Sequence, residues 1–196
     1  MTLGPDYFEK VYAASSDPWG FTTRWYEERK YALTLAMLPR PRYADAFEPG
    51  CSIGVLTTLL APRCDRLLSC DVSPEAVRQA RLRSPGTRVE QRMLPEEWPA
   101  GEFDLIVFSE LLYYLDRDDL RRVVDLGAGS LKPGGTLLAV HWRHPVSDHP
   151  LTGDEAHAAL RATGLSLLAE HREADFLAEV YVDGDPVSVA AAEGLT

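Results

Sequence analysis

Glu48-Pro49-Gly50-Cys51-Ser52-Ile53-Gly54 stands between a strand-like run, residues 43–47, and the apolar stretch 55–61. Two glycines four residues apart let the backbone leave the strand sharply and approach a ligand closely, because neither has a Cβ. Free amides at the start of the next helix then face the crevice. A pyrophosphate-binding loop would have three glycines, but Ser52 and Val55 occupy the second and third glycine positions. The turn therefore predicts a nucleoside ligand without a diphosphate.

Outward from this turn, strand-like and helix-like segments alternate. Ser73 and Pro74 begin one helix with a capping hydroxyl and a proline, and residues 152–155 form a capping box before another. Residues 92–102 are too few and too rich in proline for a full crossover helix, and residues 132–135 are expected to form a turn. Strands are expected at residues 43–47, 66–70, 87–91, 103–109, 136–142, 165–171 and 177–182. Helices are expected at residues 6–14, 24–38, 55–61, 118–130 and 152–162, and a further helix should begin at residue 73.

This alternation predicts an α/β fold, a single Rossmann-like doubly wound domain. Its mostly parallel seven-stranded sheet should have helices on both faces and an antiparallel edge strand, because a short polar segment joins the last two strands. Ligands in such sheets bind beyond the carboxyl ends of the strands. A length of 196 residues fits one domain, with residues 1–40 as a helical cap over the cleft, 41–186 as the α/β core and 187–196 as a loose tail.

Composition narrows the class of protein. A hydrophobic fraction of 45% and a charged fraction of 26% are typical of a globular domain. No apolar run approaches the ~20 residues that span a bilayer, and the first residues do not resemble a secretory signal, so a cytoplasmic protein without membrane contact is expected. Three cysteines, Cys51, Cys64 and Cys70, without Cys-x-x-Cys spacing indicate reduced structural thiols and no metal site.

Charge bears on the partners. Twenty Lys and Arg against thirty Asp and Glu give a net charge of −10, which opposes binding to a nucleic-acid backbone. The same charge either favours cationic or neutral small substrates or simply keeps the protein soluble.

Four segments in register carry a family resemblance: the turn 48–54, the strand-end acid Asp71, Phe103 to Glu110, and Leu131 to Gly135. Together they resemble the class I S-adenosylmethionine-dependent methyltransferases. Asp17-Pro18-Trp19 and the stretch Trp25 to Leu35 add a similarity to the nodulation protein S branch. That branch includes an N-methyltransferase acting on the free amine of a partly deacetylated chitin oligosaccharide.

The resemblance implies a site for S-adenosylmethionine, with S-adenosylhomocysteine as product. Asp71 would accept from both ribose hydroxyls, or else be a helix-capping or surface acid. Glu48 would meet the methionine end, or pair with a basic neighbour. Arg29 and Lys30 would bind the methionine carboxylate and Trp19 would close the cleft, although a solvated helix face explains Arg29 and Lys30 equally well. The other implied methyl-donor contacts are Gly50, Cys51, Ser52 and Gly54 in the turn, Val72, Met93 and Leu94 around adenine or in the core, and Ser109 and Glu110 at the ammonium.

An alkylamine is mostly protonated at neutral pH, because its pKa is about 10.4 by analogy with lysine. It must therefore lose a proton before it attacks a methyl group. Candidate catalytic residues at the strand ends are Glu110, Tyr113, His141 and His144, although a strand-end histidine is commonly structural. His149, His157 and His171 have no such placement argument.

The expected function is therefore transfer of a methyl group to a small polar molecule, with an amine, such as that of an amino sugar, as the favoured acceptor. A hydroxyl or carboxylate acceptor is the alternative. A nicotinamide-dependent oxidoreductase and a non-catalytic S-adenosylmethionine-binding module are less favoured. A monomer or a homodimer fits equally.

Overall fold

A computed structural model describes residues 1–196. Seven strands form one sheet in the order β3-β2-β1-β4-β5-β7-β6. From β1 the chain first adds strands on one side of the sheet and then, from β4, on the other side. β1 and β4 are parallel neighbours at this switch of side. This switch point is where doubly wound sheets bind ligands. The strands are β1 Tyr43–Pro49, β2 Cys64–Asp71, β3 Arg88–Gln91, β4 Phe103–Ser109, β5 Leu131–Trp142, β6 Ser166–Arg172 and β7 Phe176–Val182.

The predicted fold class is confirmed. Strands β3, β2, β1, β4 and β5 run parallel, whereas β7 pairs antiparallel with both β5 and β6. One expectation needs correction, because residues 132–135 lie inside β5 and not before it. The β4–β5 register shifts between Phe103 and Leu105, which accommodates the Pro-Gly-Gly segment as an irregularity of the strand.

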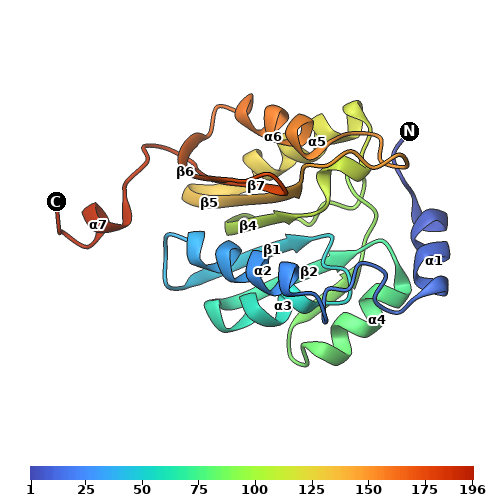
Figure 1. Ribbon diagram of the computed structural model, residues 1–196. Coiled ribbons are helices and arrows are strands. Elements are labelled where there is room, and N and C mark those ends of the chain that lie inside the picture. Colours follow the sequence, from blue (N-terminus) through green and yellow to red (C-terminus); the bar gives the residue numbers. More distant parts are fainter.

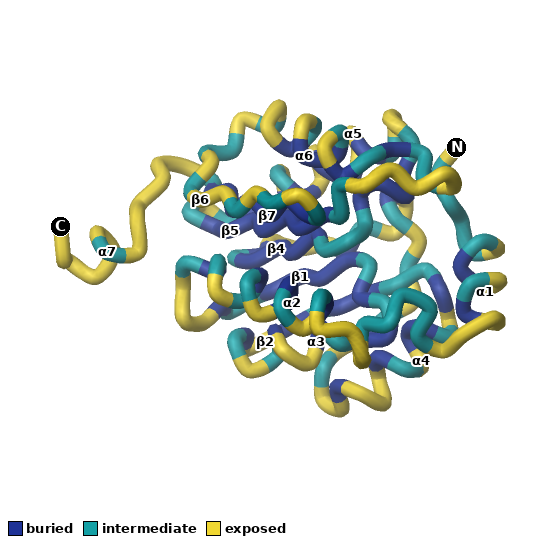
Figure 2. The backbone as a smooth tube through the Cα atoms, in the orientation of Figure 1, coloured by how far each residue is buried: buried dark blue, intermediate teal, exposed yellow.

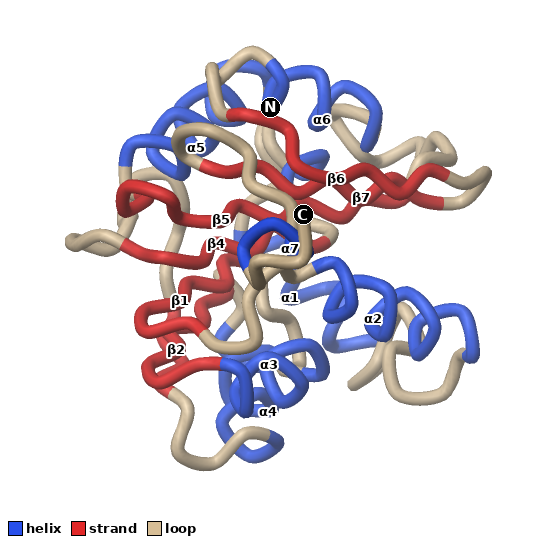
Figure 3. The backbone as a smooth tube through the Cα atoms, turned by 90° about the vertical axis from the view of Figure 1, so that its left-hand side faces the viewer, coloured by secondary structure: helices blue, strands red, loops and turns tan.

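Helices cover both faces of the sheet (Figures 1 and 3). α5 and α6 lie on one face and α2 and α3 on the other. The helices are α1 Pro5–Ala14, α2 Trp25–Met37, α3 Val55–Leu60, α4 Pro74–Arg83, α5 Arg117–Gly129, α6 Gly153–Arg161 and α7 Val189–Ala192, with short 3₁₀ turns η1 Ala61–Arg63 and η2 Leu112–Tyr114. None of these helices has the length and hydrophobicity that crossing a membrane requires.

The strand period of two divides the core into two layers. In β4, Ile106 and Phe108 pack in one cluster with α5 and α6, whereas Leu105 and Val107 pack in the other with α2 and α3. Burial is accordingly greatest in the central strands (Figure 2). α7 has no buried residue and projects from the body of the domain.

Candidate active site

A cavity of about 670 Å³ opens at the carboxyl ends of β1, β2 and β4, beneath the amino-terminal segment. It contains most of the predicted site residues but not Arg29, Gly54, His141 or His144. Those that line it are Trp19, Glu48, Gly50, Cys51, Ser52, Asp71, Val72, Met93, Leu94, Ser109, Glu110 and Tyr113.

The glycine turn is built on three left-handed residues, with φ of +74° at Gly50, +50° at Ser52 and +80° at Gly54. The amides of Gly50 and Cys51 both donate to the Cys70 carbonyl, at 2.8 and 2.9 Å, and so fasten the turn to β2. A Cβ at Gly54 would lie 2.8 Å from both Cα and Cβ of Ala80 in α4. Gly54 therefore permits close helix packing, in place of the predicted ligand contact.

Asp71, at the end of β2, connects the glycine turn to the loop that follows β2. Its carboxylate accepts from the amide of Ser52 at 2.8 Å and from the amide of Ser73 at 2.9 Å. Burial raises its pKa, against the lowering effect of these amides. Each carboxylate oxygen can accept more than one hydrogen bond, so the side chain retains acceptor capacity toward the cavity.

Glu48 is 2% exposed, and one of its oxygens accepts from the hydroxyls of Thr57 and Ser69, both at 2.6 Å. Hydroxyl partners replace the basic neighbour considered as the alternative. Burial raises the pKa of this carboxyl to about 7. The two hydroxyls lower this pKa, and the nearby Asp71 adds a weaker raising effect. Glu48 can therefore change charge near neutral pH.

The two residues predicted to cover an adenine face differ from each other. Met93 is 46% exposed at the rim of the cavity, so the interpretation of Met93 as a core residue is wrong. Leu94 lines the cavity and also packs against the core cluster of β4 and α5.

Glu110 is the centre of a side-chain network. Its oxygens accept from Lys30 Nζ at 2.6 Å, from the Tyr113 hydroxyl at 2.5 Å and from the Trp142 amide at 2.9 Å. Its own φ is +52°, which turns the chain immediately after β4. Three hydrogen-bond donors already occupy this carboxylate, so its geometry suits an orienting role better than proton abstraction.

Lys30 is 2% exposed and lines the cavity. Burial would lower its pKa, but Glu110 and Glu27, whose carboxylate lies 3.0 Å away, outweigh burial and raise it. Its ammonium is thus retained and held between two carboxylates. The neighbouring Arg29 points elsewhere, with a bidentate ion pair to Glu173 at 2.8 and 2.9 Å outside the cavity.

His141 was predicted at the rim of the site, but it lies in the core. It is fully buried, and its Nε2 accepts from the Leu112 amide at 3.2 Å. Nδ1 must then carry the proton, which it donates to His157 Nε2 at 3.1 Å, and His157 Nδ1 donates to Glu179 at 2.6 Å. Burial lowers the pKa of His141 well below its usual value. This series of hydrogen bonds holds η2 in place below the site.

His144 also lies away from the cavity, with its Nε2 2.8 Å from Asp175 on the exposed surface. A histidine without a predicted role, His149, lines the cavity instead. Its ring stacks on Tyr113 at 4.7 Å with an interplanar angle of 12°. Only its position after β5 could have indicated this placement, because no motif surrounds it.

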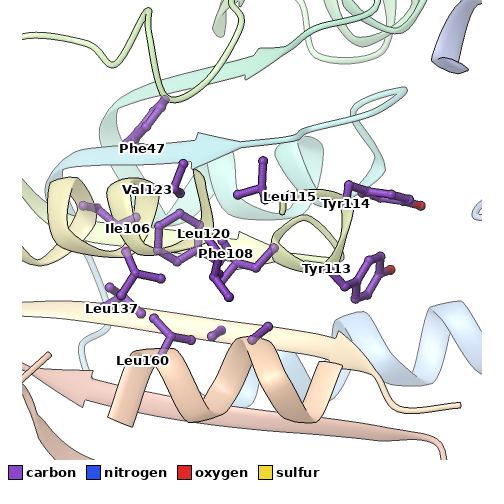
Figure 4. Close-up of a cluster of buried hydrophobic side chains, with 14 of the residues drawn as sticks. Phe47, Ile106, Phe108, Tyr113, Tyr114, Leu115, Leu120, Val123, Leu137 and Leu160 are labelled. Atoms are coloured by element: carbon purple, nitrogen blue, oxygen red, sulfur yellow. The ribbon is translucent and has the colours of Figure 1, made fainter. Parts of the chain in front are cut away.

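Aromatic side chains form much of the remaining wall. Tyr113 and Tyr114 lie at one end of the core cluster, with their hydroxyl groups pointing away from it (Figure 4). Tyr7, Tyr26 and Trp142 also line the cavity. None of these three was predicted as a site residue, because aromatic residues in amphipathic helices, such as Tyr7 and Tyr26, or at the end of a strand, such as Trp142, are equally typical of core packing.

The amino-terminal segment covers the cavity through specific bonds. The Leu3 amide donates to the Tyr114 carbonyl at 2.9 Å, and the Tyr12 hydroxyl lies 2.6 Å from Ser52 Oγ. Trp19 packs edge-on against Tyr12, at 5.7 Å. The cover therefore contacts both the glycine turn and the segment after β4.

Comparisons with known proteins agree with this geometry. The family pattern described as nodulation protein S matches residues 6–174. Nodulation protein S of Bradyrhizobium diazoefficiens is 37% identical over 134 residues, which cover 64% of this chain and 62% of that protein. The match to the Rhizobium tropici protein is also 37% identical and spans 55% of its length. The matched part is thus less than two thirds of these curated relatives.

Solved structures extend the similarity. A candidate methyltransferase from Pseudomonas syringae is 51% identical, with a TM-score of 0.72 over 81% of this chain and 99% of its own. The N-methyltransferase NodS from Bradyrhizobium japonicum WM9, in complex with S-adenosyl-L-homocysteine, is 26% identical, with a TM-score of 0.83 over 92% of this chain and 98% of its own. The chain belongs to the nodulation protein S family, a branch of the class I S-adenosylmethionine-dependent methyltransferases.

Proposed function

We propose that this protein transfers the methyl group of S-adenosylmethionine to an amine on a small polar molecule such as an amino sugar. The observation that carries the proposal is the single cavity that joins the glycine turn and Asp71 at one end to Glu110, Tyr113 and Trp142 at the other. The two ends are called the donor end and the acceptor end below. The chain's similarity to an N-methyltransferase crystallised with S-adenosylhomocysteine supports this assignment.

The donor end suits a nucleoside with a zwitterionic tail. Asp71 would accept from the ribose hydroxyls, with Val72, Met93 and Leu94 beside the adenine. The turn at Gly50 and Cys51 would pass close to the methionine part, near Ser109 and Glu48. Of the two cations that the sequence offered for the methionine carboxylate, Lys30 lines the cavity and Arg29 does not, although Glu27 and Glu110 already neutralise Lys30.

The acceptor end suits an amine. Tyr26, Tyr113 and Trp142 present aromatic surface, which attracts ammonium groups and packs against the apolar faces of sugars. Glu27 and Glu110 bring negative charge close to the same space. The net charge of −10 adds a field that favours cationic over anionic acceptors and disfavours nucleic acid.

The chemistry is an in-line displacement, in which a nitrogen–carbon bond forms as the carbon–sulfur bond breaks. The protein's part is to align the two reactants and to exclude water. Contacts of Leu3 with Tyr114 and of Tyr12 with Ser52 place the amino-terminal segment over the cavity for this purpose.

A calorimetric titration with S-adenosylhomocysteine, followed by an assay of its release from S-adenosylmethionine, tests the proposal. Amino sugars and simple amines should be turned over, and their N-acetylated forms, phenols and carboxylates should not. Turnover of hydroxyl or carboxylate acceptors alone would replace N-methylation by O-methylation. Tight binding without any turnover would identify a non-catalytic module, and hydride transfer detected by absorbance would point to an oxidoreductase.

A further inference from the structure

His149 occupies an unusual position on the loop between β5 and α6. Its ring stacks on Tyr113 at 4.7 Å and meets the Tyr114 ring edge-on at 4.6 Å. The loop is fixed there by backbone bonds from His149 to the Val146 carbonyl at 3.1 Å and from Leu151 to the Tyr113 carbonyl at 3.3 Å. The imidazole is therefore held in the cavity by stacking and by its backbone.

All the carboxylates that line the cavity already have hydrogen-bond or ion-pair partners in the protein. Glu110 and Asp71 accept hydrogen bonds as described above, Glu48 accepts from two hydroxyls, and Glu27 pairs with Lys30. The remaining two, Glu96 and Asp119, both pair with Arg122. The His149 side chain makes no hydrogen bond or ion pair with the protein, so its ring nitrogens are available to a ligand.

The charge state of His149 also fits a proton acceptor. Burial lowers its pKa, and this outweighs the raising effects of Asp148 on its own loop and of Glu110 across the cavity. Its ring also contacts the phenols Tyr113 and Tyr114, and Tyr7 lines the same cavity; burial raises the pKa of each, so all three remain neutral. The imidazole is thus neutral at pH 7 and has a free nitrogen lone pair that can accept a proton.

We infer that His149 is the catalytic base that takes the proton from the acceptor's ammonium group. This role rests on the proposed N-methylation. The ammonium nitrogen gives its proton to an imidazole nitrogen and recovers a lone pair. That lone pair forms the bond to the methyl carbon while the carbon–sulfur pair returns to sulfur, which leaves S-adenosylhomocysteine and a methylammonium product. The imidazolium then releases its proton to solvent.

The test compares His149→Gln with His144→Gln, which changes the same residue type on the same loop outside the cavity. With an amino sugar at pH 7, kcat/KM of His149→Gln should fall about 10²-fold, the scale of general base catalysis, and that of His144→Gln should stay within twofold. Calorimetric affinity for S-adenosylhomocysteine should change less than threefold in both. Added imidazole should partly restore turnover to a His149→Ala variant.

The pH profile separates a base from a residue that only shapes the wall. Wild-type kcat/KM should be flat from pH 7 to 9, whereas that of His149→Gln should rise toward the acceptor's pKa, because solvent then supplies the free amine. A deficit that is the same at pH 7 and pH 9, or a His149→Gln variant with more than a third of wild-type kcat/KM at pH 7, would overturn the inference. If the wild type itself releases no S-adenosylhomocysteine, the proposed function fails instead.

Discussion

The two ends of the cavity are constructed differently. At the donor end, backbone amides fix the geometry, since Ser52 and Ser73 donate to Asp71, and Gly50 and Cys51 donate to one carbonyl of β2. At the acceptor end, side chains from distant segments meet, as in the pair of Lys30 and Glu110, 80 residues apart. A backbone site follows from a short local motif, whereas a side-chain site depends on the whole tertiary structure. Four predictions test this contrast, in order of decreasing effect.

The largest effect is expected at the acceptor end. Lys30→Met leaves the carboxylates of Glu27 and Glu110 buried without their cation, which should lower the free energy of unfolding by about 4 kcal/mol. Arg29→Met is the matched control, since its pair with Glu173 is 41% exposed on the arginine side and its loss should cost far less. Urea unfolding measures both. Equal losses would show that the buried network does not hold the acceptor end together.

Next in size is a pH effect at the donor end. The Glu48 carboxyl has a pKa raised to about 7 in the folded protein, so it stabilises the fold below its unfolded pKa of about 4.5, and this contribution is lost as pH rises through 7. Relative to Glu48→Gln, the wild type should therefore lose about 3 kcal/mol of unfolding free energy between pH 4 and pH 8. Parallel stability curves for the two proteins would contradict a protonated Glu48.

Asp71→Asn should weaken methyl-donor binding. The amide group replaces an oxygen that accepts from a backbone amide, and hydrogen bonds to charged groups are worth about 1.5–3 kcal/mol, so the Kd for S-adenosylhomocysteine should rise about 10²-fold. Asp175→Asn, outside the cavity, should leave the Kd unchanged. A rise of less than threefold in the first variant would remove Asp71 from the donor end.

The smallest effect is a difference between two glycine variants, and it separates conformation from packing in the turn. Gly54 and Gly164 have φ of +80° and +83°, but a Cβ at Gly54 would meet Ala80 at 2.8 Å and a Cβ at Gly164 would meet nothing within 4 Å. Gly164→Ala should cost about 1 kcal/mol from φ alone, and Gly54→Ala about 2 kcal/mol more. Similar melting temperatures for the two variants would mean that the turn does not depend on its contact with α4.

Much of the donor end was predictable from sequence. The turn at 48–54, Asp71 and Ser109 lie at the ends of strands whose apolar patterns are clear, and parallel strands bring their carboxyl ends together. Gly54 shows the limit of the motif, because the glycine pattern does not say whether a missing Cβ makes room for a ligand or for a helix.

The acceptor end was less predictable for physical reasons. His141 was expected at the rim, but α6 covers the end of β5 and buries it against His157. Arg29 and Lys30 are adjacent, and only the orientation of α2 against the sheet decides which of them enters the cavity. His149 reaches the cavity because its loop folds back onto Tyr113, a contact that no local pattern encodes.

The most direct test of the account follows a labelled methyl group from S-adenosylmethionine into a glucosamine oligomer by mass spectrometry. The label should appear on the amine nitrogen, and none should appear on the fully N-acetylated oligomer. A label on a hydroxyl oxygen, or no transfer to any amine by protein that binds S-adenosylhomocysteine, would contradict it.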